Sequence, residues 1–302
     1  MSAQADSTKT VLLALGANFG IALGKTIAAI FTKSGSMLAE AIHSFADCAN
    51  QGLLLWGMKA AKQEPDEDHP LGYGKAIYFW SFVVALLLFS VGGLFSIREG
   101  WHKLHAPEPL HQAWIAIGIL LLSVILESVS MHGCVKEVNK VRDGRSWLQW
   151  FRETRQAELV VIFGEDLAAL CGLSIALVAV VITALTGDPT YDALGSIAIG
   201  ILLVIVAFFL SREIKAMLVG QSAEAPIRQG IENFVAQSPS IEMVLNVITL
   251  HFGDDLMVAI KARFREVPSV AELSARINEI EAGLKQAYPQ IKWIFFEPDT
   301  EK

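Results

Sequence analysis

Apolar residues divide the chain into long hydrophobic runs separated by short charged segments. The hydrocarbon core of a bilayer is about 30 Å thick, so a helix needs about 20 apolar residues to cross it. Six runs reach this length, and they cover residues 10–32, 36–58, 77–97, 113–135, 158–185 and 190–211. The pattern therefore predicts an α-helical membrane protein, a bundle of six transmembrane helices.

Beyond residue 215 the pattern changes to that of a small soluble domain. Helical spacing of apolar residues occurs at 226–236 and 270–288, and strand-like runs occur at 247–252, 256–264 and 291–296. Gly253-Asp254 lies between the first two strands, as expected for a hairpin. The order α-β-β-α-β predicts a ferredoxin-like α+β domain at the C-terminus. We therefore divide the chain into a transmembrane domain, 1–215, and a cytoplasmic domain, 216–302. A domain this small buries little apolar surface, so we expect it to pair with a second copy in a homodimer.

Composition and charge agree with a membrane location. Hydrophobic residues make up 53% of the chain and charged residues 18%, against about 25% charged in soluble domains. The net charge of −7 argues against nucleic acid as a partner.

Lysine and arginine lie mainly on one side of the predicted spans. Three lie on the other side: Lys33, Arg98 and Lys103. Twelve lie on the side of both termini: Lys9, Lys59, Lys62, Lys75, Lys136, Lys140, Arg142, Arg145, Arg152, Arg155, Arg212 and Lys215. Basic loops stay in the cytoplasm. We therefore expect a multi-pass protein of the inner cell membrane, with both termini in the cytoplasm and the first run retained as a helix.

Several ionisable residues interrupt the apolar runs, where each charge costs about 2.5–3.5 kcal/mol on insertion scales. In the second run Glu40, His43 and Asp47 are spaced to lie on one helical face. An imidazole nitrogen and a carboxylate oxygen one turn apart are suitable ligands for one metal ion. The fifth run contains Glu165 and Asp166. Carboxylates repel each other unless a cation lies among them, so these acids together predict a cation site.

Two further ionisable residues in the runs have less certain roles. Lys25, in the first run, is a candidate for the balancing cation when no metal is bound. Glu127 lies in the fourth run, where a hydrogen bond between helices would explain it equally well.

Other motifs occur in a consistent order around these residues. The segment His69-Pro70-Leu71-Gly72-Tyr73-Gly74-Lys75 precedes the third run, Tyr191-Asp192-Ala193-Leu194-Gly195-Ser196 opens the sixth, and Glu297-Pro298 lies near the end. Together with His43-xxx-Asp47 and the acidic pair of the fifth run, they resemble the cation diffusion facilitator family, also called the zinc transporter or solute carrier 30 family. The resemblance covers nearly the whole chain. It is strongest with the branch that contains a vertebrate mitochondrial zinc transporter and its bacterial relatives.

The resemblance implies a homodimeric, proton-coupled exporter that works by alternating access. It also implies a four-ligand site built from the second and fifth spans, and it carries His43, Asp47 and Asp166 over as metal ligands. The fourth family ligand lies one turn before Asp166, where this chain has Ile162, which cannot bind metal. Either the longer side chain of Glu165 reaches the ion, or the fourth ligand is water.

Other possible metal sites of the family are weaker in this chain. Ala275 and Phe295 stand where many relatives bind metal through histidines in the cytoplasmic domain, so we do not expect a regulatory metal cluster there. His251 is alone, and we interpret it as structural. Asp66-Glu67-Asp68-His69 is either a weak peripheral metal site or a solvated acidic turn, since Tyr73 replaces the second histidine. Three histidines of the outer loop are interpreted as interfacial: His102, His105 and His111.

The sequence thus predicts a divalent cation efflux transporter that exchanges Zn²⁺ for protons. Zinc is the transported substrate, Mn²⁺, Fe²⁺ or Co²⁺ would also suit the ligands, and no permanent cofactor is expected. Two other classes stay open, a non-transporting membrane scaffold or metal sensor and an intramembrane metal-dependent hydrolase. Because the chain has no HExxH motif, we do not expect an enzyme.

Overall fold

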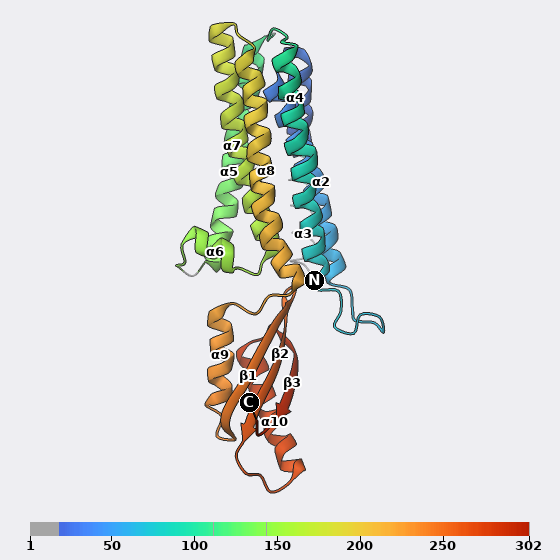
Figure 1. Cartoon of the computed structure of the whole chain (residues 1–302), viewed down its shortest axis with the longest axis vertical. Helices are drawn as coiled ribbons and strands as arrows, with labels where there is room; N and C mark the ends of the chain where they lie inside the picture. Colours follow the sequence, from blue (N-terminus) through green and yellow to red (C-terminus); the bar gives the residue numbers. More distant parts are fainter. Residues whose placement is uncertain (1–17, 111, 143, 302) are drawn as a thin grey trace. The chain divides into compact units, whose positions relative to one another are not determined.

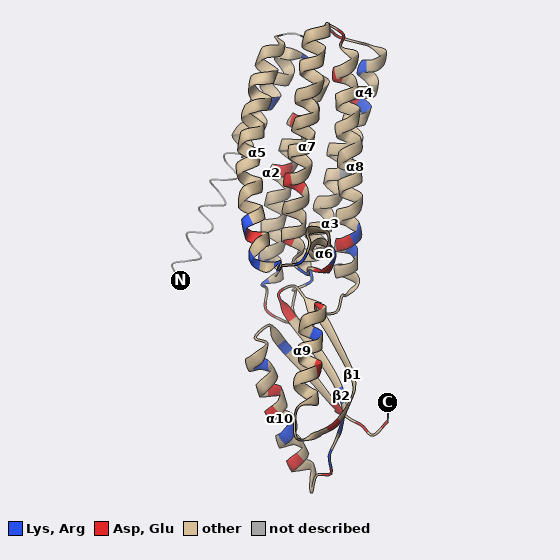
Figure 2. Cartoon of the chain, turned by 90° about the vertical axis from the view of Figure 1, so that its left-hand side faces the viewer, with Lys and Arg blue, Asp and Glu red and all other residues tan. Residues whose placement is uncertain are grey.

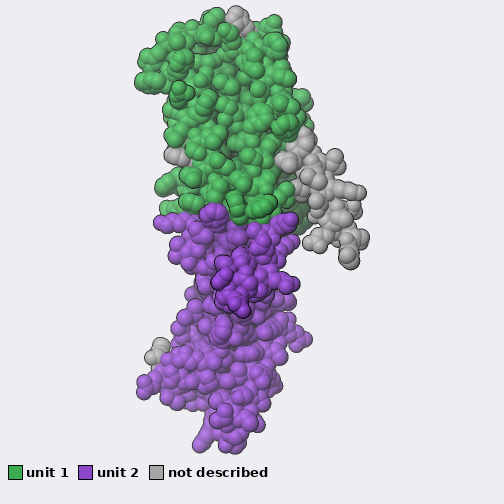
Figure 3. Space-filling model, turned by 90° about the vertical axis from the view of Figure 1, so that its right-hand side faces the viewer, with its two compact units in different colours: residues 1–57, 80–147, 158–213 green, residues 58–79, 148–157, 214–302 purple. Residues whose placement is uncertain are grey.

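The computed structural model describes residues 18–110, 112–142 and 144–301. The chain forms two compact units, shown in different colours in Figure 3. The first, here the helical unit, contains 1–57, 80–147 and 158–213, and the second, here the α+β unit, contains 58–79, 148–157 and 214–302. The proposed division at residue 215 stays a prediction. The α+β unit also includes 58–79, which joins α2 to α3, and 148–157, which contains most of α6.

The helical unit contains long helices that run side by side (Figure 1). After a first helix, Asn18–Thr32, the described elements are α2 (Gly35–Ala61), α3 (Ala76–Leu87), the π-helix η1 (Leu88–Leu94), α4 (Phe95–His105), α5 (Ala113–Val141), α6 (Trp147–Glu153), α7 (Ala157–Thr186) and α8 (Thr190–Val219).

Within the described residues, four of these helices are long and apolar enough to span a membrane: the continuous segment α3-η1-α4, α5, α7 and α8. The 27-residue α2 has the necessary length but carries the polar face predicted from its sequence. The helical membrane fold is therefore confirmed. Residues 10–17 of the first predicted span lie outside the described residues.

The spanning helices extend past the predicted ends of their apolar runs. The third continues from residue 97 to His105, the fourth from 135 to Val141 and the sixth from 211 to Val219. Hydropathy detects the apolar part of a helix, whereas the helix itself continues until a helix-breaking residue. The segment after His105 contains Pro107, and Gly220 follows Val219 with a φ of 125°.

Small residues bring the third span close to α8. A Cβ atom on Gly100 would lie 2.6 Å from the Ala193 carbonyl oxygen, and one on Gly200 would lie 2.7 Å from the Gly93 carbonyl oxygen. At this contact the Ser196 hydroxyl donates a hydrogen bond of 2.9 Å to the Ser96 carbonyl. Small residues of this kind allow close packing of helices in a membrane.

The α+β unit contains a three-stranded sheet in the order β1-β2-β3. Its elements are α9 (Ala225–Ala236), β1 (Ile241–Phe252), β2 (Asp255–Phe264), α10 (Val270–Ala287) and β3 (Ile291–Pro298). β1 is antiparallel to β2, and β3 is parallel to β2, as the crossover through α10 requires. This α-β-β-α-β order confirms the predicted fold class.

The core of this unit lies between the two helices and one face of the sheet. Leu256, Val258 and Ile260 of β2 pack with Ile231 of α9 and Leu284 of α10. Strand β1 begins six residues earlier than predicted. Register shifts between Ile241 and Met243, and between Val244 and Asn246, disturb the alternation on which the prediction relied.

Candidate metal-transport site

One face of α2 is polar through the middle of the helix. Glu40, His43, Asp47 and Asn50 lie on it, and Glu40, His43 and Asn50 are fully buried. The His43 Nδ1 atom lies 3.5 Å from Asp47 Oδ1, one turn further along. The predicted alignment of Glu40, His43 and Asp47 is therefore present. Within the described residues, both His43 ring nitrogens and Asp47 Oδ1 are buried without a hydrogen-bond partner.

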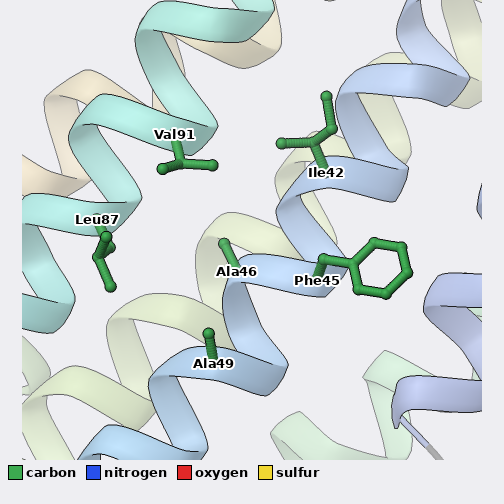
Figure 4. Close-up of a pocket in the computed structure, with 6 residues that line it drawn as sticks. All are labelled: Ile42, Phe45, Ala46, Ala49, Leu87 and Val91. Atoms are coloured by element: carbon green, nitrogen blue, oxygen red, sulfur yellow. The ribbon is translucent and has the colours of Figure 1, made fainter.

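Another face of α2 is apolar. Ile42, Phe45, Ala46 and Ala49 line a pocket with Leu87 of α3 and Val91 of η1 (Figure 4). These side chains carry no metal-binding atoms, so this pocket is not a metal site.

Lys25 of the first helix is committed to Glu40. Its ammonium lies 3.3 Å from Glu40 Oε2 and donates a hydrogen bond of 2.7 Å to the Ser44 hydroxyl, with both charged side chains almost fully buried. A Cβ atom on Gly172 of α7 would lie 2.6 Å from Glu40 Oε1, so this glycine leaves room for the carboxylate. Lys25 thus balances Glu40 directly rather than Asp47 or Asp166.

The adjacent acids of α7 contact different helices. Glu165 is 7% exposed, and its Oε1 atom accepts a 2.5 Å hydrogen bond from Asn50 Nδ2 of α2. Asp166 is half-buried, and its Oδ2 atom accepts a 3.2 Å hydrogen bond from the Ser130 hydroxyl of α5. Neighbours in a helix differ by about 100° in direction, which explains the two partners. Ile162, one turn before Asp166, is 37% exposed.

The predicted ligands lie near one another but do not form a metal-binding cluster. Asp47 lies within electrostatic range of Glu165 and Asp166. Among the described residues, however, no group of three or more His, Cys, Asp or Glu side chains is close enough to hold a metal ion. Figure 2 shows acidic residues near the middle of the helical unit, where most of the other residues are uncharged. The arrangement is an acidic, buried region whose donors would have to move together to coordinate an ion.

Sequence reasoning missed three polar residues of this region: Ser44, Asn50 and Ser130. A signal for Asn50 was available, because it lies three residues after Asp47 on the same helical face. Ser44 and Ser130 could not be selected from other span serines, because their importance comes from contacts with other helices.

The acidic turn before α3 is well ordered by its own side chains. The Tyr73 hydroxyl donates a 2.6 Å hydrogen bond to Asp66 Oδ2, which holds the pKa of that carboxyl below its usual value. His69 Nδ1 lies 3.3 Å from Asp66 Oδ1. These bonds use Asp66 in the turn itself, as expected of a solvated acidic turn.

The histidines of the outer loop and the positions that lack metal-binding residues in the α+β unit are mostly exposed. His102 and His105 are exposed on α4, and His111 lies outside the described residues. In the α+β unit, Ala275 and Phe295 are exposed. Burial lowers the pKa of His251 below its usual value. Its interpretation as a structural residue stays a prediction.

Comparison with known proteins shows the family of the chain. The family model described as "cation efflux transmembrane domain" matches residues 11–219. A human protein named "proton-coupled zinc antiporter SLC30A9, mitochondrial" is 33% identical over 247 residues, which are 81% of this chain and 44% of the relative. "Metal tolerance protein C4" of Arabidopsis thaliana is 32% identical over 220 residues, 72% of this chain and 48% of the relative. The chain therefore spans less than half the length of these two relatives.

Proposed function

Because the chain belongs to the cation diffusion facilitator family, we propose that it exports a divalent metal ion, zinc first among candidates, through its helical unit. This family consists of transporters, so the hydrolase class is excluded. The observation that carries the proposal is the buried pair His43 and Asp47 on the polar face of α2, opposite the acids of α7.

The proposed ligands are His43, Asp47 and Asp166, with Glu165 or water as the fourth. One nitrogen and several carboxylate oxygens suit Zn²⁺ and also accept Mn²⁺, Fe²⁺ or Co²⁺. The name of the human relative, a zinc antiporter, supports zinc, and the name of the plant relative, a metal tolerance protein, supports a metal substrate. Zinc is the transported substrate in this proposal, and the protein keeps no resident cofactor.

We propose proton antiport by competition at His43. The ion binds the neutral imidazole and ionised carboxylates while the site opens to the cytoplasm. When the site opens to the other side, a proton takes the imidazole nitrogen and the ion leaves. Each cycle thus exchanges metal for proton at the same atoms. The human relative is named as a proton-coupled antiporter, which supports this coupling.

A second copy of the chain is the proposed partner of the α+β unit. Residues Ile248, Ala259 and Phe295 are register partners across the sheet, so they share one face. This face is opposite the one that α9 and α10 cover, and Ile248 and Phe295 are 54% and 55% exposed. Exposed apolar residues on an uncovered sheet face favour pairing with a second copy.

The protein is a multi-pass membrane protein. We propose the inner cell membrane as its location and the cytoplasm for both termini, because twelve of the counted basic residues lie on that side.

Flux measurement tests the proposed function. Full-length protein in vesicles that contain a zinc-sensitive dye should import or release zinc, and an opposing pH gradient should accelerate this flux. His43→Ala and Asp166→Ala should each reduce the rate by at least about tenfold, since each removes a ligand. His102→Ala changes an exposed histidine of α4 and serves as the control. Absence of zinc flux in the wild-type protein would remove the transport proposal, and wild-type flux in both variants would overturn the assignment of His43 and Asp166 as ligands.

A further inference from the structure

The region around Asp166 lacks one ligand on its own helix. Ile162 occupies the place one turn before Asp166 and is 37% exposed. Glu165 is turned toward α2, where Asn50 donates a 2.5 Å hydrogen bond to it. Another helix is therefore the place to look for a further protein donor beside Asp166.

Asp166 itself indicates which helix this is. Its carboxylate contacts Ser130 of α5 at 3.2 Å, so α5 and α7 are adjacent at this level. Glu127 lies three residues before Ser130 and shares its face of α5. This glutamate is at the middle of the 29-residue α5, which is apolar enough to span a membrane. A carboxylate at that depth is costly and is usually functional.

Glu127 also faces the α2 ligands. It lies within electrostatic range of His43, Asp47 and Asp166. Among the described residues, Glu127 has no hydrogen-bond or ion-pair partner, and Lys25 pairs with Glu40 instead. The fully buried His43 ring has two nitrogens without hydrogen-bond partners beside this group.

From this placement we propose that Glu127 supplies the fourth metal ligand, so that the ion is held by three helices, α2, α5 and α7. The inference rests on the proposed function and names a residue of the same site. One imidazole and three carboxylates then surround the ion, a suitable donor set for zinc. Because no three of these groups lie within coordinating distance in this structure, metal binding draws Glu127 and Asp166 toward His43 and Asp47.

The test compares carboxylate variants of the full-length protein in zinc binding and flux. Glu127→Gln keeps the size of the side chain but removes its charge, and it should weaken zinc binding at least tenfold in competition with a zinc dye. Glu127→Asp should bind between wild type and Glu127→Gln.

Two variants make the result specific. Glu137→Gln removes a charge from an exposed position of the same helix, where Glu137 pairs with Lys140 at 2.6 Å, and it should bind zinc as wild type does. Glu165→Gln tests the competing ligand, and Glu127→Gln should weaken zinc binding more than Glu165→Gln does.

The outcomes separate this inference from the proposed function. Wild-type affinity in Glu127→Gln together with lost affinity in His43→Ala overturns the role of Glu127 and leaves the transporter proposal in place. Lost affinity in Glu165→Gln with intact binding in Glu127→Gln assigns the fourth ligand to Glu165. Intact binding in every variant, His43→Ala included, overturns both. Size-exclusion profiles of the metal-free variants establish that each is folded.

Discussion

Ionisable side chains inside the helical unit fall into two groups according to their partners. Lys25 and Glu40 form an ion pair, and the Lys25 ammonium also donates a hydrogen bond to the Ser44 hydroxyl. Among the described residues, Glu40 Oε1, both His43 ring nitrogens and Asp47 Oδ1 are each buried without a hydrogen-bond partner, but Glu40 has Lys25 as its counter-ion, whereas no Lys or Arg is paired with His43 or Asp47. Buried polar atoms are normally paired, so the unpaired group is the better candidate for binding and the paired group for stability.

The Lys25–Glu40 pair gives a prediction at the residue scale. Lys25→Ala should destabilise the metal-free protein by about 3–5 kcal/mol, because it leaves a buried carboxylate without its counter-ion. Lys25→Met combined with Glu40→Gln should recover much of this loss. Thermal unfolding in detergent measures both.

The matched control for this pair is on the surface. Lys33 lies 3.2 Å from Glu108, with both side chains about half exposed. Lys33→Met should cost about 0–1 kcal/mol, as for other exposed ion pairs. If Lys25→Ala unfolds at the wild-type temperature, the buried pair contributes no net stability.

At the scale of elements, the first turn of α2 is capped by another helix. Asp192 of α8 accepts hydrogen bonds from Ser34 Oγ at 2.6 Å and from the Gly35 backbone N–H at 2.5 Å. Ser34 Oγ also accepts a hydrogen bond from the Met37 N–H at 3.1 Å. The first N–H groups of a helix have no partner within it, so Asp192 satisfies donors that would otherwise be buried and unpaired. This contact also sets the position of α2, and with it His43 and Asp47.

Removal of the cap should therefore affect both stability and metal binding. Asp192→Ala should destabilise the protein by about 1–3 kcal/mol, because it leaves buried donors unpaired. It should also weaken zinc binding. Asp192 contacts α2 at Gly35, about two helical turns before His43, so the effect would come through the position of α2. Leu194→Ala, at a 48% exposed position of the same helix, is the control. Unchanged unfolding temperature and zinc affinity in Asp192→Ala would show that the cap does not position α2.

At the scale of the whole molecule, the α+β unit gathers segments that are distant in sequence. Lys75 lies 4.9 Å from the ring centre of Phe252 at the hairpin of β1 and β2, and the Tyr78 hydroxyl donates a 3.3 Å hydrogen bond to the Gly253 carbonyl. Arg155 Nε donates a 2.9 Å hydrogen bond to the Ser222 carbonyl. The loops before α3 and α7 are thus tied to the same unit as the sheet, as expected if they share one side of the membrane.

This arrangement predicts the accessibility of two loops. Glu64→Cys should react with an impermeant maleimide only after the membrane is opened, whereas Glu108→Cys should react in intact cells. Both positions are exposed, so burial does not decide the difference. The wild-type protein, with Cys48, Cys134 and Cys171 in its helices, gives the background. The reverse labelling pattern would show the opposite orientation.

Local properties of the sequence determined the existence of the apolar spans, the order of elements in the C-terminal domain and the alignment of His43 with Asp47. Hydropathy and the 3.6-residue period act within a single segment, so they need no knowledge of its neighbours. The predicted helix ends were less accurate, because a helix can continue through polar residues beyond its apolar run. The predicted start of β1 was also less accurate, because bulges interrupt the alternation of apolar and polar residues.

Contacts between helices were decided only by the tertiary structure. The pairing of Lys25 with Glu40, the cap that Asp192 gives α2, and the opposite partners of Glu165 and Asp166 all depend on which helices become neighbours. The same holds for Glu127, which the sequence marks only as a carboxylate in a span. A helical period gives the direction of a side chain around its own axis, whereas its partner is set by the packing of the bundle.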